Sequence, residues 1–293
     1  MESGTAPGPN HVHCRESFPV REGIGTLFIV GGAGTPRLIH EEFFRLAGGR
    51  KARVIHIPSA TISFGNIRPE DLREEYAEFY EHEPESFEFL HTYDRAVAED
   101  VAFARPLEGA TGVWMGGGDQ NRLAELFVDT EVVRGLRRVV QRGGVVGGTS
   151  SGAAIFSDTM ICRGYEEMRC GRGFALYPRA IVDSHFSGRR RHRRLARAVL
   201  QRPDHAGVGV DEWTALLVQG ERIGVIGREG RGVSYHFADP ASGQVRRYRL
   251  GVGEAVDVGV AVLEADHALV EARLRGSREP EVLTPEWIAQ PDE

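Results

Sequence analysis

Val145-Val-Gly-Gly-Thr-Ser-Ser-Gly-Ala153 is the stretch from which the rest of the chain is best understood. The two valines predict the end of a buried strand, and Gly148 to Gly152 fit the pattern G-x-S-x-G, which lies on a sharp turn between a strand and a helix. Glycines flank the serine in this pattern because a Cβ would obstruct the tight turn. Ser150 is therefore the first candidate nucleophile, with Ser151 as its rival. A glycine-rich turn without chemistry is the alternative, and the pentapeptide alone leaves both interpretations open.

Length and composition favour a globular protein with a substantial core. The chain has 293 residues, of which 41% are hydrophobic, and this suits one large domain or two small ones. It has no apolar run long enough to cross a membrane. Its start, Met1 to Asn10, lacks the basic and apolar segments of a secretory signal. We therefore predict a cytoplasmic protein without a membrane partner.

The cysteines and the first histidines predict neither a disulfide framework nor a metal site. Cys14, Cys162 and Cys170 are odd in number and include no C-x-x-C pair. His11 and His13 lie close to Cys14 and could in principle bind a metal, but a flexible leader over residues 1–22 is the more ordinary interpretation. We expect no metal and no cofactor.

The charged residues are unevenly distributed. The net charge of −6 argues weakly against nucleic acid as a partner. One short stretch is nevertheless strongly basic, and it contains Arg189, Arg190, Arg191, Arg193, Arg194 and Arg197. A solvated helix face is the usual interpretation of such a run, and a nucleic-acid stripe is the second. Because the run directly follows Asp183-Ser-His-Phe186, its first arginines could instead bind an anionic group of a substrate.

Apolar runs that end in glycine alternate with amphipathic segments through the first two hundred residues. This alternation predicts an α/β fold with a mostly parallel central sheet flanked by helices on both faces. Strands are expected at 26–32, 53–58, 87–92, 112–116 and 145–146, with helices at 37–47, 70–80, 97–104 and from 130 to 143. Beyond Gly207 the pattern changes to antiparallel strands and a β-rich C-terminal part. We expect a single α/β domain over 23–275 and a polar C-terminal tail over 276–293.

A serine hydroxyl needs a base within hydrogen-bond reach and a third group that orients the base. His185 ends the apolar segment from Ala180, and Glu212 ends the segment from Gly207. Both therefore follow strand ends, where a parallel sheet gathers its functional residues. We predict that Ser150, His185 and Glu212 converge at one rim of a single sheet. Taken alone, His185 could be a structural histidine and Glu212 a loop carboxylate.

Four motifs give the chain a resemblance to a known family. They are Trp114-Met-Gly-Gly-Gly-Asp-Gln120, Gly147-Gly-Thr-Ser-Ser-Gly-Ala153, Asp183-Ser-His-Phe-Ser187 and Gly207-Val-Gly-Val-Asp-Glu-Trp-Thr-Ala-Leu216. Together they resemble the motifs of cyanophycinases over about residues 24–220. Those proteins are serine peptidases whose fold is similar to class I glutamine amidotransferases, which are flavodoxin-like, and to aspartyl dipeptidases. The resemblance implies an exopeptidase that cuts the poly-aspartate backbone of cyanophycin, a nitrogen store, and releases β-Asp-Arg dipeptides.

The resemblance also implies roles for individual residues and a homodimer. It makes Ser150 the nucleophile, His185 the general base and Glu212 the orienting acid. Backbone amides of Gly117, Gly118 and Ser151 would form an oxyanion hole. The residues in its substrate-binding positions are Gln120, Asp183, Ser184, Arg189, Arg191 and Arg194.

One position departs from the family pattern, which usually has Asp-Gln-His-Phe where this chain has Ser184. Serine is shorter and offers a hydroxyl in place of an amide, so one contact to the dipeptide unit could be missing or bridged by water. An aspartyl or isoaspartyl dipeptidase, or a specialised enzyme for altered polymer, is therefore the alternative. A non-catalytic polyanion-binding protein is the alternative from another class. A glutamine amidotransferase is disfavoured because its nucleophile would be a cysteine and none lies at the turn.

Overall fold

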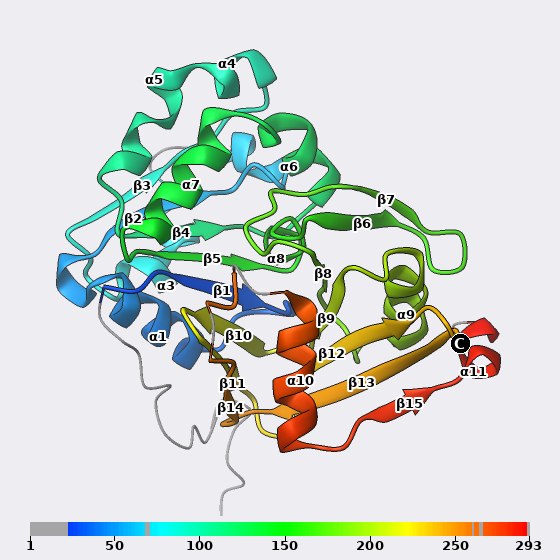
Figure 1. Cartoon of the computed structure of the whole chain (residues 1–293). Helices are drawn as coiled ribbons and strands as arrows, with labels where there is room; N and C mark the ends of the chain where they lie inside the picture. Colours follow the sequence, from blue (N-terminus) through cyan, green and yellow to red (C-terminus); the bar gives the residue numbers. More distant parts are fainter. Residues whose placement is uncertain (1–22, 68–70, 260, 264–265, 292–293) are drawn as a thin grey trace, which may run out of the picture.

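The computed structural model describes residues 23–67, 71–259, 261–263 and 266–291. Its strands form a large mixed sheet, a second sheet and a small hairpin (Figure 1). No helix within the described ranges is long and apolar enough to span a bilayer.

The larger sheet has eight strands. Five of them are parallel neighbours, and the other three continue the sheet in antiparallel pairing. In spatial order they are β14 (Ala255–Asp257), β11 (Arg222–Gly227), β10 (Thr214–Gln219), β1 (Thr26–Val30), β5 (Val145–Thr149), β4 (Gly112–Met115), β2 (Arg53–Ile57) and β3 (Ser86–Phe89). The carboxyl ends of β1, β5 and β4 therefore meet at one edge.

The second sheet has five strands and borders the first. In spatial order they are β15 (Glu281–Leu283), β13 (Gln244–Gly251), β12 (Gly232–Asp239), β9 (Ala206–Val210) and β8 (Ala180–Asp183). Only the pair of β8 and β9 is parallel within it. A separate hairpin consists of β6 (Thr159–Arg163) and β7 (Arg169–Arg172).

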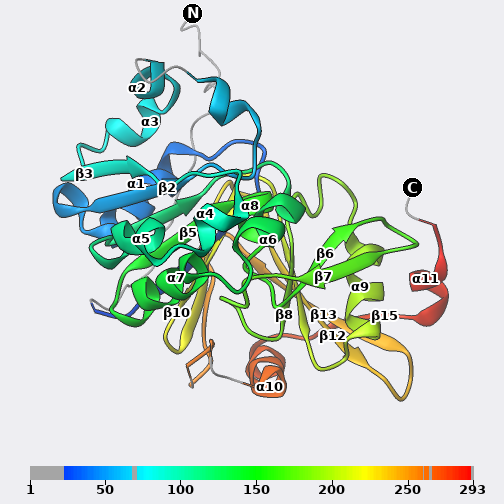
Figure 2. The same cartoon turned by 90° about the horizontal axis from the view of Figure 1, so that it is seen from above.

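Helices cover both faces of the larger sheet (Figures 1 and 2). Successive side chains of a strand point to opposite faces, so Leu27 and Ile29 pack with one set of helices and Phe28 and Val30 with the other. The first set consists of α4 (Arg95–Glu99), α5 (Val101–Ala104), α6 (Gln120–Phe127), α7 (Glu131–Gln141) and α8 (Ser151–Ala154). The other face is covered by α1 (Arg37–Ala47) and α3 (Ala77–Tyr80), and α2 (Leu72–Glu75) precedes α3.

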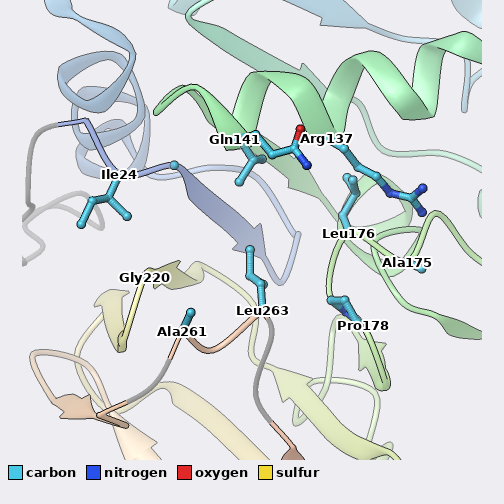
Figure 3. Close-up of a pocket in the computed structure, with 11 residues that line it drawn as sticks. Ile24, Arg137, Gln141, Ala175, Leu176, Pro178, Gly220, Ala261 and Leu263 are labelled. Carbon is cyan, nitrogen blue, oxygen red and sulfur yellow. The ribbon is translucent and has the colours of Figure 1, made fainter.

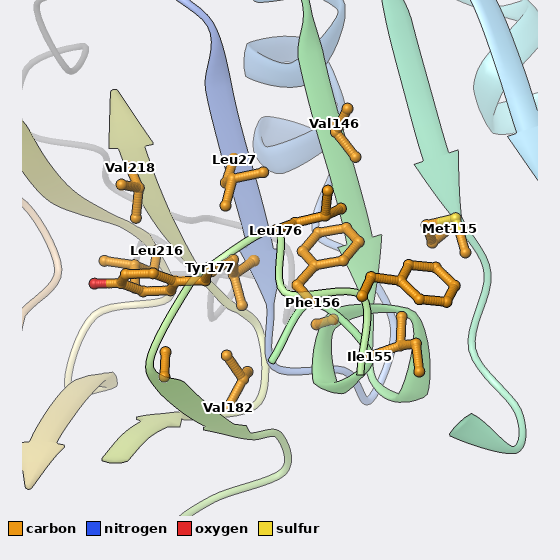
Figure 4. Packing of buried hydrophobic residues seen from close by; sticks show 14 of the residues in the cluster. Leu27, Met115, Val146, Ile155, Phe156, Leu176, Tyr177, Val182, Leu216 and Val218 are labelled. Atoms are coloured by element: carbon orange, nitrogen blue, oxygen red, sulfur yellow. The ribbon is translucent and has the colours of Figure 1, made fainter. Parts of the chain in front are cut away.

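One hydrophobic core joins the two sheets. Figure 4 shows Leu27, Val146 and Met115 of the larger sheet beside Val182 of the second, with Phe156 and Tyr177 among them. The outer face of the second sheet packs on α9 (His192–Gln201) through Leu195 and Val199. Because the core is continuous, side chains at the junction of the two sheets have fixed positions.

The α/β alternation predicted from the sequence is confirmed, and two local predictions are corrected. The helices expected at 70–80 and 97–104 are each two short helices, α2 with α3 and α4 with α5. Asp100 interrupts the second of them because it caps α5, where its carboxylate accepts the amide of Ala102. The expectation of one sheet for all the site residues is wrong, because β8 and β9 belong to the second sheet.

The C-terminal residues differ from the expected polar tail. Helix α10 (His267–Ser277) packs Val270 and Leu274 into the main core, and β15 pairs with β13. Helix α11 (Pro285–Ala289) then packs on α9, where Ile288 is buried. The apolar residues Leu283 and Ile288 explain this packing, so the packed chain extends well past residue 275.

Candidate active site

Ser150 lies on a strained turn directly after β5. Its backbone has φ 55° and ψ −117°, a conformation that non-glycine residues rarely adopt. Its amide donates to the carbonyl of Val30 over 3.0 Å, which ties the turn to the end of β1. A Cβ on Gly148 would lie 2.3 Å from the carbonyl oxygen of Gly152. The glycines of the motif thus permit the close approach that produces the turn.

His185 follows β8 and Glu212 follows β9, so the second sheet supplies both. The hydroxyl of Ser150 lies 2.8 Å from Nε2 of His185, and Nδ1 of His185 lies 2.9 Å from Oε1 of Glu212. A carboxylate can only accept, so Nδ1 carries the proton and Nε2 accepts the serine hydroxyl. The structure therefore brings together, in one chain of hydrogen bonds, a nucleophile, a base and a carboxylate.

The surroundings of His185 keep its imidazole neutral. Burial lowers the pKa of His185 below its usual 6.5, the hydrogen bond to Glu212 acts in the opposite direction, and the charge of Arg189 lowers the pKa again. A neutral imidazole is the form that can take a proton from serine. The neighbouring carboxylate of Asp211 does not compete with Glu212, since it accepts the amides of Ser187 and Gly232 and pairs with Arg249.

Ser151 is oriented differently from Ser150. Its hydroxyl donates to the carbonyl of Gly118 over 2.6 Å and lies 2.8 Å from Oε1 of Gln120. Its hydroxyl is therefore engaged in hydrogen bonds. Ser151 is the first residue of α8, so its amide lies next to Ser150. Of the two serines in the motif, Ser150 is the one whose hydroxyl contacts the histidine.

Gly117 borders Ser150 on the side of β4. A Cβ placed on Gly117 would lie 3.4 Å from Cβ of Ser150. Within the described residues, the amides of Gly117 and Ser151 donate to no backbone carbonyl. Gly118 has φ +144°, and a Cβ placed on it would lie 2.4 Å from the carbonyl oxygen of Ala60. This glycine loop can therefore present free amides next to the serine.

The residues in the implied substrate-binding positions fall into two groups. Gln120 is occupied, because its amide group also donates to the carbonyl of Ile161. Asp183 is 2% exposed and is bound by two arginines, over 2.9 Å from Nε of Arg194 and 3.1 Å from Nη1 of Arg191. Arg194 is itself buried and stacks on the ring of Tyr165. Asp183 and Arg194 thus form a buried ion pair rather than a free clamp.

Arg189 and Arg191 are the more accessible members of this set. Arg189 is exposed, and its backbone amide donates to the carbonyl of His185 over 3.0 Å. Arg191 also donates to the carbonyl of Ser184 over 2.7 Å, and Ser184 is buried. The cationic residues Arg189 and Arg191 therefore lie close to His185, and Arg189 is the one exposed to solvent.

Gly32 also lies in the site, although the sequence does not predict it there. A Cβ at this position would lie 2.5 Å from Nε2 of His185, and its φ is +94°. The signal for it was present, because a pair of glycines, Gly31 and Gly32, directly follows the first strand. What the sequence alone does not reveal is that the imidazole from another sheet rests on that pair.

An apolar hollow elsewhere in the molecule carries none of this chemistry. It measures about 380 Å³, and Figure 3 shows Ile24, Gln141 and Leu263 among the residues that line it. Ile24 precedes β1 and Gln141 precedes β5, so the hollow lies at the end of the sheet opposite to Ser150.

Within the described residues, no group of three or more His, Cys, Asp or Glu side chains is arranged to hold a metal ion. Cys162 and Cys170 are free thiols on β6 and β7. His11, His13 and Cys14 lie outside the described residues, as does the leader over residues 1–22.

Comparison with solved structures shows a similar fold in another protein. The crystal structure of a peptidase from an acI-B1 Actinobacterium superposes with a TM-score of 0.61 at 21% identity, covering 80% of this chain and 98% of that chain. At this identity the similarity concerns the fold alone.

Comparison of sequences gives closer relationships. The cyanophycinase of Geminocystis herdmanii is 33% identical over 229 residues, which are 72% of this chain and 82% of that protein. The cyanophycinase of Trichormus variabilis is 35% identical over 225 residues, 73% of each chain. The model of peptidase family S51 matches residues 27–226, a range that includes Ser150, His185 and Glu212. The chain therefore belongs to peptidase family S51.

Proposed function

We propose that this protein is a serine exopeptidase that hydrolyses cyanophycin, multi-L-arginyl-poly-L-aspartate, through an acyl-enzyme and releases β-Asp-Arg dipeptides. The observation that carries the proposal is the pair of contacts from Ser150 to His185 and from His185 to Glu212. The relatives that are named cyanophycinases support the choice of substrate.

In the proposed reaction, Nε2 of His185 takes the hydroxyl proton of Ser150 as the oxygen attacks an aspartyl backbone carbonyl. Glu212 holds the imidazole in the correct tautomer and stabilises the imidazolium. The amides of Gly117, Gly118 and Ser151 stabilise the oxyanion, and His185 then donates the proton to the leaving amine. Water, deprotonated by the same imidazole, attacks the acyl-enzyme and releases the product.

The charged residues beside His185 would bind the ends of the polymer. We infer that Arg189 and Arg191 hold free carboxylates by charge-assisted hydrogen bonds. Asp183 and Arg194 act indirectly, because their buried ion pair holds Arg191 in place. Gln120 holds the glycine loop in place through its hydrogen bond with Ser151. Because the side chain of Ser184 is short, we infer that a water molecule bridges it to the substrate.

Several finer assignments accompany this proposal. We infer a fold like that of class I glutamine amidotransferases, since the turn with Ser150 follows a central parallel strand. We further propose a single peptidase domain, a cytoplasmic location, a homodimer, and a role in releasing stored nitrogen, without a cofactor, nucleic acid or membrane as partner.

Incubation of the purified protein with insoluble cyanophycin tests the function, with products resolved by mass. We expect β-Asp-Arg to appear, and Ser150→Ala to lower the rate by at least about 10⁴-fold because the nucleophile is gone. Ser242→Ala, on an exposed turn, is the matched control. Full activity of a folded Ser150→Ala protein would exclude the proposed nucleophile. Cleavage of soluble aspartyl dipeptides with intact polymer would support the dipeptidase instead.

A further inference from the structure

Two arginine side chains stack on the ring of Trp213, the residue after Glu212. The guanidinium carbon of Arg228 lies 4.9 Å from the ring centroid, and that of Arg231 lies 5.1 Å from it. Both arginines come from the turn between β11 and β12, which joins the two sheets. We call Trp213, Arg228 and Arg231 the arginine–tryptophan cluster.

The two guanidinium groups of the cluster have no carboxylate partner within the described chain. Glu229 lies between the two arginines in the sequence but forms no ion pair with either of them within the described chain. Two other acids close to the cluster are engaged elsewhere, Asp211 with Arg249 and Glu212 with His185. Arginines on the neighbouring strand β13 are instead paired, as Arg246 is with Glu271. Two like charges held on one ring repel each other, so an anion between them would be stabilising.

Backbone hydrogen bonds hold the cluster in place beside Ser150, His185 and Glu212. Trp213 has φ +57°, which is rare for a bulky residue and marks strain. Its amide donates to the carbonyl of Gly32 over 3.1 Å, and its own carbonyl accepts the amide of Arg228 over 2.9 Å. Gly32 in turn lies against Nε2 of His185. Trp213 of the cluster therefore directly follows Glu212 in the chain, and one hydrogen bond ties it to Gly32, which lies against the imidazole of His185.

We propose that Arg228 and Arg231 form a carboxylate subsite that holds the free α-carboxylate of a substrate arginine outside the bond to be cut. This inference rests on the proposed function, in which every β-Asp-Arg unit carries such a carboxylate. A guanidinium group matches a carboxylate with two parallel hydrogen bonds. The ring of Trp213 keeps both guanidinium groups extended at the rim, so little side-chain freedom is lost when the anion binds.

Two substrates separate this subsite from general charge effects. One is a synthetic oligomer of β-Asp-Arg units, and the other is the same oligomer with each arginine α-carboxylate converted to a carboxamide. The test variant is the double substitution Arg228→Gln with Arg231→Gln. The control is Arg73→Gln, because Arg73 also stacks on an aromatic ring, 4.8 Å from Tyr80, at the far edge of the larger sheet.

We expect the double variant to raise KM for the carboxylate oligomer by about tenfold or more, with kcat within about twofold, because charge-assisted hydrogen bonds are lost. KM for the carboxamide oligomer should not change, and Arg73→Gln should alter neither substrate. An equal rise in KM for both oligomers, or no rise, overturns the subsite.

Failure of the proposed function is recognised separately, because the wild-type protein would then cleave neither oligomer. In that case calorimetry with the Ser150→Ala protein, with and without the two arginine substitutions, still decides the inference. A loss of affinity limited to the carboxylate oligomer supports the subsite. Equal affinities in the two proteins, or no binding, overturn it.

Discussion

The candidate site depends on contacts that leave no room for a methyl group. Gly32 is the clearest case, because the nearest atom to an added Cβ would be Nε2 of His185, the atom that accepts the Ser150 hydroxyl. Gly34 in the same loop also has positive φ, at +86°, but a Cβ there meets nothing within 4 Å. A comparison of substitutions at Gly32 and Gly34 therefore distinguishes the effect of backbone strain from the effect of displacing the imidazole.

Gly32→Ala should therefore lower kcat by at least about 100-fold, because a shift of the imidazole by about 1 Å has that effect. Gly34→Ala should keep its activity and lose only about 1–2 kcal/mol of stability from its left-handed backbone. Steady-state kinetics and thermal melts of both variants give the comparison. Equal losses of activity would mean that strain in the loop, not contact with His185, is responsible.

The positions of the triad residues could be anticipated because functional side chains gather at strand ends. Ser150, His185 and Glu212 each follow a strand, and their roles remain predictions. The pairing of Asp183 with Arg194 could not be anticipated, since α9 must first fold over β8 to join them. The same holds for Trp213, whose arginine neighbours come from a turn about fifteen residues later in the chain.

Helix α9 links the candidate site to the C-terminal elements β15 and α11. Its residue Arg194 binds Asp183, while Leu195 and Val199 pack in one cluster with Leu283 and Ile288. Nε of Arg197 also donates to the carbonyl of Ile288 over 3.0 Å. Strand β15 and helix α11 therefore support the helix that holds the buried ion pair.

Deletion of residues 280–293 should destabilise the protein by about 3–6 kcal/mol, because two large apolar side chains and the surface they cover are lost. It should also weaken kcat/KM by loosening Arg194. Denaturant unfolding and kinetics measure the two effects, and a chain shortened by residues 292–293 is the control. Unchanged unfolding midpoints after the longer deletion would show that these elements contribute nothing to α9.

The sequence predicted the elements of the first half more accurately than their assembly. Alternating apolar patterns placed α1, α7, β4 and β5 near their observed bounds, since each is a regular amphipathic or apolar run. The division into two sheets was missed because β8 and β9 are apolar runs like the others. Which strands they join depends on contacts with β12 and β13 far along the chain.

Buried histidines link the stability of the folded protein to pH. Burial lowers the pKa of His56 and of His236 from 6.5 to about 3, and that of His40 and of His267 to about 4. Below about pH 6.5 the unfolded chain takes up protons that the folded chain does not. Stability should thus fall as the pH decreases from about 6.5 towards 4.

Each such histidine contributes up to about 1.4 kcal/mol per pH unit in this range. His236 lies in the core beside Phe186, with rings 5.6 Å apart. We expect His236→Phe to reduce the loss of melting temperature between about pH 6.5 and about pH 4.5, while leaving the change above about pH 7 as it was. Parallel curves for the two proteins across the acidic range would exclude this histidine as a cause.

The connection between β9 and β10 is one of the segments in which the polypeptide passes from one sheet to the other, and it consists of Asp211, Glu212 and Trp213. The carbonyl of Gly232 receives the amide of Asp211, and Gly32 receives that of Trp213, so both ends of the connection are anchored. We expect an inserted or deleted residue to rotate the Glu212 carboxylate away from the imidazole of His185 while leaving both sheets intact. The length of this crossover, more than its composition, is therefore what evolution or a designer would have to preserve.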